Sequence, residues 1–140
     1  MRLNLHTDYA LRILMYLGRS GGMASAETIA VAHGISRNHL VKVAAELAEL
    51  GYLETRRGRG GGLALARPIG EINVGAVVRA MESLDGFVEC FDAARNTCPL
   101  ATRCGLQGAL NLALEDFLRR LDRYTVADLI KGPTMALPGL

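Results

Sequence analysis

Apolar residues recur every three or four positions through most of the chain, which is the spacing of amphipathic helices. The first predicted helix follows Thr7 as its N-cap and ends near Gly18 or Gly21. Its buried face is expected to carry Ala10, Ile13, Leu14 and Leu17. Asp8 then falls in the first turn, where a carboxylate complements the positive end of the helix dipole.

Two further helices follow, separated by a glycine turn. Ser25 is the predicted N-cap of one helix, and Gly34 ends it before Ser36 caps the next, which runs from about Arg37 to Leu50. This arrangement predicts a helix-turn-helix, and His33 is expected to be a polar surface residue. The early residues of the second helix of this motif reach base edges in the major groove. The side chains expected to face DNA are Ser36, Arg37, Asn38, His39 and Lys42.

The pattern changes to short strands after this helix. Two runs, 52–55 and 63–66, have the length of strands and flank a tip rich in glycine and arginine. The tip lacks the G-x-x-x-x-G-K-S/T order of a phosphate-binding loop, so we expect no nucleotide site. The hairpin instead predicts the wing of a winged helix-turn-helix. Its Arg56, Arg57 and Arg59 are expected to reach DNA phosphates or a minor groove.

Helical spacing returns in the second half of the chain. Asn73 is the predicted N-cap of a fourth helix that ends at Asp85-Gly86 and buries Val77, Val78, Met81 and Leu84. A long helix, from about Leu106 to Tyr124, carries more apolar surface than an isolated helix can leave in water. We therefore expect it to pack partly on its own domain and partly on the same helix of a second chain, giving a symmetric homodimer.

These elements predict a mainly α fold with a small β-hairpin wing, that is, a winged helix-turn-helix plus a long dimerisation helix. Residues 1–72 are the expected DNA-binding domain, residues 73–130 the helical dimerisation region, and residues 131–140 a flexible tail. The chain has 140 residues, half of them hydrophobic, which suits one compact domain or a small domain with a helical extension.

Charge and composition narrow the function. Residues 1–70 hold nine Lys/Arg against five Asp/Glu, whereas residues 71–140 hold seven against nine, so the front half is the basic one expected of a nucleic-acid binder. No apolar run reaches about 18 residues and the N-terminus does not read as a signal peptide, so we expect a cytoplasmic protein. No Ser/His/Asp constellation or paired-carboxylate site is readable, which disfavours an enzyme.

All three cysteines, Cys90, Cys98 and Cys104, fall within fifteen residues. Pro99 would break a continuous helix there, so the thiols are expected on a polar loop that cannot bury them as core residues. Thiolates favour iron-sulfur clusters, zinc or Cu(I), and such sites normally need a fourth ligand, here an Asp, Glu, His or backbone group that could come from another subunit. Free thiols, or one disulfide with a cysteine left over, are the alternatives.

With the wing and the cysteine loop both in view, the chain resembles the family of iron-sulfur winged-helix repressors that includes the IscR and NsrR types. The likeness covers about residues 1–130. The matching stretches are Thr-Asp-Tyr-Ala-Leu-Arg at 7–12, Ile-Ser-Arg-Asn-His-Leu at 35–40, Arg-Gly-Arg-Gly-Gly-Gly at 57–62, the three cysteines and Thr-Val-Ala-Asp-Leu at 125–129.

The resemblance implies a homodimer whose three cysteines bind an iron-sulfur cluster within residues 73–130. In the assembly-regulator branch the fourth ligand is a histidine three residues after the last cysteine, where this chain has Gln107. In the nitric-oxide-sensing branch it is an aspartate of the other subunit's first helix, which Asp8 matches. The implied cofactor is [4Fe-4S], with [2Fe-2S] as the alternative because the seven-residue first gap exceeds the five typical of assembly regulators.

The implied function is a transcriptional repressor that binds an inverted-repeat operator in double-stranded DNA and releases it when nitric oxide attacks the cluster. The alternatives are an iron-sulfur-assembly or redox- or iron-responsive regulator with the same fold, a zinc- or thiol-based regulator, and a non-regulatory iron-sulfur electron carrier. An electron carrier has no need of a basic helix and an arginine-bearing wing, and DNA binding that weakens as salt rises would exclude it.

Overall fold

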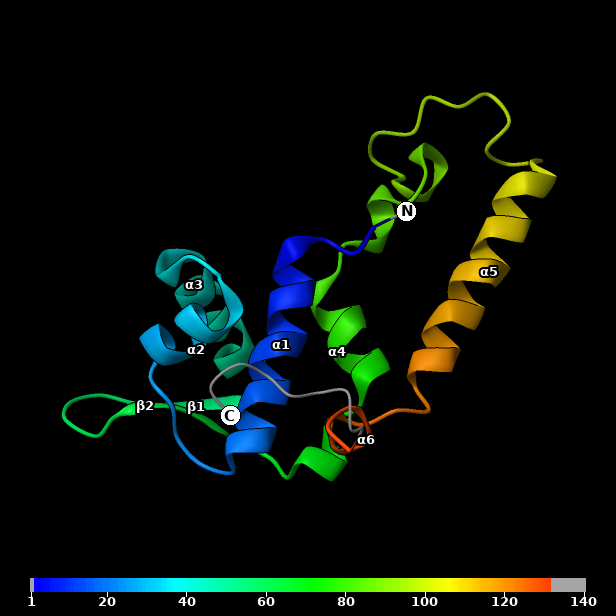
Figure 1. Cartoon of the computed structure of the whole chain (residues 1–140). Helices are drawn as coiled ribbons and strands as arrows, with labels where there is room; N and C mark the ends of the chain where they lie inside the picture. The colour runs from blue at the N-terminus through cyan, green and yellow to red at the C-terminus, as the bar shows by residue number, and fades with distance from the viewer. Residues whose placement is uncertain (1, 132–140) are drawn as a thin grey trace.

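A computed structural model describes residues 2–131 of the chain, and α1 (Leu5–Ser20) stands at its centre (Figure 1). On one side of α1 lie α2 (Ala26–His33), α3 (Arg37–Glu49) and the hairpin of β1 (Leu53–Arg56) and β2 (Gly62–Leu65). On the other side lie α4 (Val74–Met81), α5 (Gly105–Leu121) and α6 (Val126–Leu129). Short 3-10 helices fill the connections: η1 (Ile69–Glu71), η2 (Leu84–Gly86) and η3 (Glu89–Phe91). No helix in this described part is long and apolar enough to cross a membrane.

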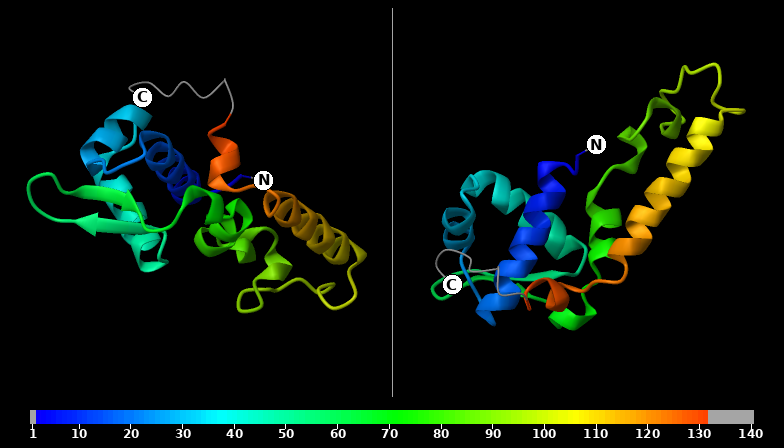
Figure 2. Two further views of the ribbon diagram at one scale, coloured as in Figure 1. Left: turned by 90° about the horizontal axis from the view of Figure 1, so that it is seen from below. Right: turned by 45° about the vertical axis from the view of Figure 1, so that its right-hand side comes forward.

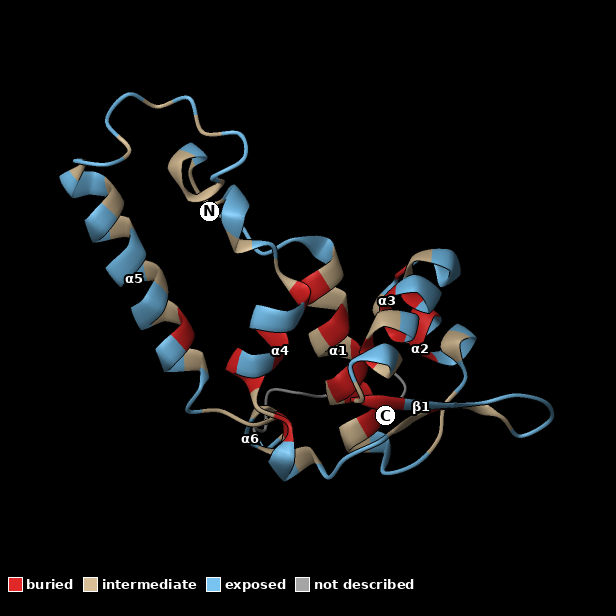
Figure 3. Cartoon of the chain, turned by 180° about the vertical axis from the view of Figure 1, so that it is seen from behind, coloured by how far each residue is buried: buried red, intermediate tan, exposed pale blue. Residues whose placement is uncertain are grey.

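The core gathers around α1, as the apolar spacing predicts. The predicted residues Ala10, Ile13, Leu14 and Leu17 of α1 are fully buried, as is the polar Thr7, and α3 buries Leu40, Val43, Ala44 and Leu47. Ile72 and Val126 close the core from the α4 and α6 side, where residue 73 also forms a bridge with Thr125. Figure 3 shows that burial falls away along α5. One core thus joins α1, α2, α3 and the hairpin to α4 and α6, whereas α5 is mostly uncovered.

The helix ends follow local capping chemistry, with one correction. Ser25, Ser36 and Asn73 are the N-caps of α2, α3 and α4, as predicted. For α1 the prediction of Thr7 is wrong, because the Asn4 side chain accepts a hydrogen bond from the Thr7 backbone N–H at 2.8 Å and starts the helix two residues before Thr7. Asn is as good an N-cap as Thr, and the apolar stripe alone does not distinguish them.

The fourth helix is shorter than predicted. It ends at Met81 rather than at Asp85-Gly86, because Glu82 has extended backbone angles (φ −100°, ψ 134°) that no helix can continue. Leu84 consequently begins η2 and is only half-buried. The long helix is present as α5, ending at Leu121, three residues before the predicted end. Of the predicted flexible tail, residues 132–140 lie outside the described part of the chain.

The hairpin pairs Leu53 with Leu65 and Arg56 with Gly62, in antiparallel register. Gly58 and Gly60 have left-handed φ angles of 92° and 71°, which allow the tight tip. A Cβ at Gly61 would collide with the Arg56 carbonyl oxygen. The turn therefore requires these glycines. The arginines are then the residues of the tip whose side chains can bind a ligand. The left view of Figure 2 shows this hairpin projecting from the rest of the molecule on the side opposite α5.

Candidate DNA-binding surface and cysteine loop

The start of α3 presents a polar, basic surface. Arg37, Asn38 and Lys42 are exposed, and Arg37 makes an exposed ion pair with Glu27 at 3.5 Å. The hydroxyl of Ser36 accepts the His39 backbone N–H at 3.2 Å, so this side chain is engaged in capping the helix. The contacts of these side chains with DNA stay a prediction.

His39 lies differently from its neighbours on α3. It is half-buried, and its ring meets the ring of Tyr9 edge-on with 4.8 Å between centroids. The ring of His6 lies 6.0 Å from that of His39. His39 therefore packs against α1, and its predicted contact with DNA has to be made from that position.

The wing supplies three exposed guanidinium groups, those of Arg56, Arg57 and Arg59. A fourth basic residue beyond the tip, Arg67, is used differently. It donates hydrogen bonds to the backbone oxygens of Gly51 (3.0 Å) and Leu50 (3.3 Å), and its guanidinium carbon lies 4.7 Å from the centroid of the Tyr52 ring. Arg67 thus joins the base of the wing to the end of α3, whereas the three arginines nearer the tip make no side-chain ion pair within residues 2–131.

The first turns of α1, which carry Asp8, contact α3 through the neighbours of Asp8. Asp8 forms an i, i+4 ion pair with Arg12 at 2.7 Å, and 37% of its side chain is exposed. Two residues before it, His6 Nε2 lies 2.6 Å from a carboxylate oxygen of Glu46 on α3. One residue after it, Tyr9 makes the ring contact with His39. A displacement of this end of α1 would therefore change the contacts that His6 and Tyr9 make with α3.

The prediction that His33 is a polar surface residue is wrong. The side chain is half-buried against α1. Its ring meets that of Tyr16 edge-on at 5.8 Å, and its buried Nε2 has no hydrogen-bond partner. Burial, followed by the positive charge of Arg12, lowers the pKa of His33, and the charge of Asp8 opposes this. His33 is the last residue of α2, and nothing in the sequence around it indicates that its ring contacts Tyr16.

The three cysteines lie on the connection between α4 and α5, as predicted for a loop. Cys90 is in η3, Cys98 is in an irregular segment, and Cys104 is the N-cap residue of α5. All three are half-buried free thiols, so the disulfide alternative has no support in this structure. Among residues 2–131 no three His, Cys, Asp or Glu side chains are gathered closely enough to hold a metal ion. Within these residues the structure therefore does not gather Cys90, Cys98 and Cys104 into one ligand set, and it does not bring Asp8 to them.

Polar contacts nevertheless shape the cysteine loop. The Glu89 carboxylate accepts both the backbone N–H of Thr97 at 2.7 Å and its hydroxyl at 2.6 Å. The Asn96 side chain accepts the Cys98 N–H at 2.9 Å. Gln107, the residue at the ligand position of the assembly-regulator branch, donates its amide to the Cys90 carbonyl at 3.2 Å. The donor set of three unpaired thiols on an accessible loop fits a cluster that takes its fourth ligand from elsewhere.

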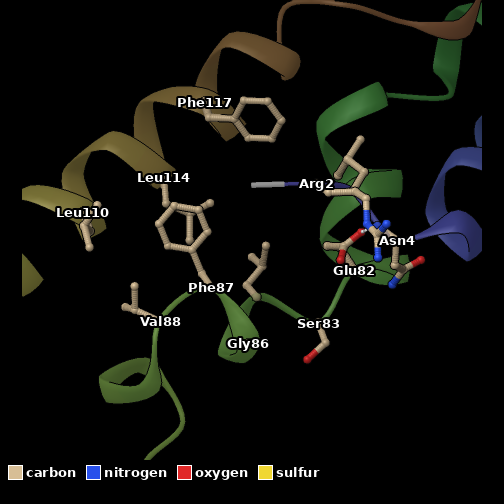
Figure 4. A pocket seen from close by; sticks show the side chains of 12 residues that line it. Arg2, Asn4, Glu82, Ser83, Gly86, Phe87, Val88, Leu110, Leu114 and Phe117 are labelled. Carbon is tan, nitrogen blue, oxygen red and sulfur yellow. Dashed lines mark hydrogen bonds between the residues drawn. The ribbon is translucent and has the colours of Figure 1, made fainter. Parts of the chain in front are cut away.

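An open apolar groove runs beside the loop. It has a volume of about 670 Å³ and lies between the N-terminal arm, η2 and the inner face of α5 (Figure 4). Leu110, Leu114 and Phe117 point into it from α5, and Phe87 faces them. Beyond the groove, Leu106 and Leu112 are about two-thirds exposed (66% and 64%). The predicted excess of apolar surface on this helix is thus present in the isolated chain.

The fold and its exposed basic residues define a winged-helix transcriptional regulator. Residues 3–132 match the Rrf2 family, described as iron-dependent transcriptional regulators, and the chain belongs to that family. It is 47% identical to the HTH-type transcriptional regulator NsrR of Bacillus subtilis, over 94% of this chain and 92% of that protein. It is 49% identical to the regulator of the same name from Geobacillus kaustophilus, over 94% and 90% of the two chains. The expectation that the protein is not an enzyme is confirmed by these relatives.

Solved structures confirm the fold class. IscR from T. potens superposes with a TM-score of 0.74, over 94% of this chain and 87% of that one, at 22% identity. The oxidised form of CymR from Staphylococcus aureus gives 0.71, over 94% and 98% of the two chains, at 23% identity. At these identities the likeness concerns the fold alone.

Proposed function

We propose that this protein is a dimeric repressor that binds an inverted-repeat operator through α3 and the wing and responds to nitric oxide through an iron-sulfur cluster. Cys90, Cys98 and Cys104 of one subunit would hold the cluster, with Asp8 of the other subunit as the fourth ligand. The cluster would be [4Fe-4S], with [2Fe-2S] as the alternative. Relatives that carry the NsrR name at 40–49% identity over nearly the whole chain support this assignment.

The observation that carries the proposal is the combination of two features on one chain. Three free, half-buried thiols occupy a loop that makes no disulfide, and they lie at the end of a helix with an uncovered apolar face. We infer that a symmetric partner covers this face, and Asp8 as fourth ligand requires that the partner's α1 reach the loop. Three thiols lack a fourth ligand, and the apolar face of α5 lacks a covering surface. Both would be supplied by a second subunit if the site were shared between the two.

The proposed DNA contacts follow from the charge and position of the exposed side chains on α3 and the wing. Arg37, Asn38 and Lys42 would contact bases and phosphates from α3, and Ser36 and His39 lie at the same helix end. Arg56, Arg57 and Arg59 would contact phosphates or a minor groove from the wing. In a dimer the two recognition helices would be repeated by the two-fold axis, which calls for an inverted repeat.

The connection between the two halves would run through α1. Asp8 lies between His6 and Tyr9, and both of these side chains contact α3. A bound cluster would supply iron that nitric oxide can attack, and Asp8 would be a hard carboxylate ligand beside three soft thiolates. An Asp8 that held no iron would pair with Arg12, as it does in the isolated chain. The first turn of α1 would then move, and His6 and Tyr9 would carry that movement to α3.

The position of Gln107 favours this branch over an assembly regulator. Its amide is engaged with the Cys90 carbonyl, and an amide is a poor ligand for cluster iron. A zinc- or thiol-based regulator would keep the DNA-binding half and lose the response of the cluster to nitric oxide.

The test compares Asp8→Ala with Arg12→Ala and the unmodified protein, all purified without oxygen. Iron and acid-labile sulfide, visible absorption and operator affinity before and after nitric oxide are measured for each. We expect the unmodified protein to be coloured and to lose operator affinity on nitric oxide addition. Asp8→Ala should hold the cluster less firmly and lose the response. An Asp8→Ala protein with the same cluster and the same response would overturn the assignment of Asp8.

A further inference from the structure

The neck of the cysteine loop is closed by a side chain that is not a thiol. The Glu89 carboxylate oxygen Oε1 accepts two hydrogen bonds from Thr97, one from its backbone N–H at 2.7 Å and one from its hydroxyl at 2.6 Å. The two residues are eight apart in sequence. Each directly precedes a cysteine, Cys90 and Cys98 respectively. One carboxylate therefore ties together the two chain positions from which these thiols project.

The contact has the character of a built clasp. Both donors of Thr97 reach the same oxygen at distances short for neutral partners, as expected when the acceptor is charged. Two further bonds act in the same direction, from the Cys98 N–H to Asn96 and from Gln107 to the Cys90 carbonyl.

We propose that Glu89 is a positioning residue for the cluster, acting by holding Cys90 and Cys98 at one neck through its two hydrogen bonds to Thr97. This inference rests on the proposed function for the identity of the group that the thiols bind. The hydrogen bonds also fold back the seven-residue gap between the first two cysteines, because they join residue 89 directly to residue 97.

The alternative role of Glu89 is that of a surface charge, and the two roles predict opposite effects. A cluster held by thiolates is anionic, so a neighbouring carboxylate that acts only through its charge disfavours the cluster. Removing that charge would then make the cluster bind more firmly. If Glu89 acts as a clasp, removing the acceptor loosens the loop and the cluster binds less firmly.

A graded set of variants separates the roles. Glu89→Gln removes the charge and keeps one carbonyl acceptor, Glu89→Ala removes both, Thr97→Val removes only the hydroxyl bond, and Thr97→Ser keeps both donors. Asp85→Ala is the matched control, because Asp85 is an exposed carboxylate in the same connection and accepts no side-chain or backbone hydrogen bond within residues 2–131. We expect the rate of cluster loss to a chelator to rise about three- to tenfold in Glu89→Ala. It should rise less in Thr97→Val and Glu89→Gln, and stay unchanged in Thr97→Ser and Asp85→Ala.

A second measurement reads the clasp without any cluster. In cluster-free protein carrying Cys104→Ser, a short bifunctional alkylating reagent joins Cys90 to Cys98, and the rate reports how often the two thiols meet. Glu89→Ala should slow this cross-linking by a similar factor, and Thr97→Ser should not. Equal rates in Glu89→Ala and its parent, or firmer cluster binding in Glu89→Gln, would overturn the proposal. If the unmodified protein bound no cluster, the proposed function would fail while the cross-linking assay would still test the clasp.

Discussion

Breaking the contact between His6 and Glu46 should uncouple the state of the cluster from the affinity for DNA. The contact is 2.6 Å long and joins the first turn of α1 to the recognition helix, with 28% of the His6 side chain and 41% of the Glu46 side chain exposed. A partly exposed pair of this kind contributes at most about 1 kcal/mol, which is about a fivefold change in an equilibrium constant. The ratio of operator affinities with and without the cluster should therefore fall by up to about fivefold in Glu46→Ala.

The assay is fluorescence anisotropy with a labelled operator at fixed salt, using each protein in its cluster-loaded and its cluster-free form. Glu49→Ala is the control, because Glu49 is an exposed carboxylate on the same helix that makes no ion pair within the described residues. It removes the same charge near DNA and should leave the ratio unchanged. A double-mutant cycle with His6→Ala isolates the pair from its surroundings. If Glu46→Ala changed both affinities by the same factor, α1 would not carry the signal to α3 by this contact.

Three further predictions follow from other parts of the structure. Arg57→Ala should weaken binding to all DNA sequences alike and reduce the salt slope of the affinity by about 0.9 for one lost phosphate contact, which a salt titration measures. Gly75→Ala should lower the free energy of unfolding by about 1–3 kcal/mol in urea titrations. A Cβ at this buried position would lie 2.9 Å from the Asp122 backbone nitrogen and would displace the carboxylate that pairs with Arg79. Gly70→Ala is the control, because the space around Gly70 is open, and it should leave the free energy of unfolding unchanged. Because the folded-state pKa of His33 lies below its ordinary 6.5, the unfolded chain binds the proton more readily, so stability should fall as pH drops through and below 6.5, and His33→Gln should flatten that part of the pH profile.

The fold was largely readable from the sequence because its elements depend on local signals. The stripe of α3, the caps Ser25 and Ser36 and the glycine-rich tip each act within a few residues, and each was placed correctly. Two helix boundaries were predicted wrongly, because apolar spacing does not fix where a helix begins or ends. Asn4 rather than Thr7 caps α1 through a local hydrogen bond to the Thr7 N–H, and α4 ends at Met81 because Glu82 has extended backbone angles.

The candidate site was less readable from the sequence. The sequence identifies the cysteines as a loop cluster, but it gives no sign that Glu89 bonds to Thr97 or that His39 packs against Tyr9. The first contact depends on the path of an irregular loop and the second joins two different helices, so neither follows from a periodic pattern. Asp8 was found by resemblance alone, since a carboxylate in the first turn of a helix is ordinarily explained by the helix dipole.

The central claim is best tested by following absorption and operator binding in one sample while nitric oxide is added without oxygen. The account predicts a coloured protein with near-equal iron and sulfide that binds the operator and releases it in step with the loss of the cluster spectrum. Two results would contradict this account: a colourless protein that still bound the operator, or a coloured protein that stayed bound to the operator after its spectrum had changed.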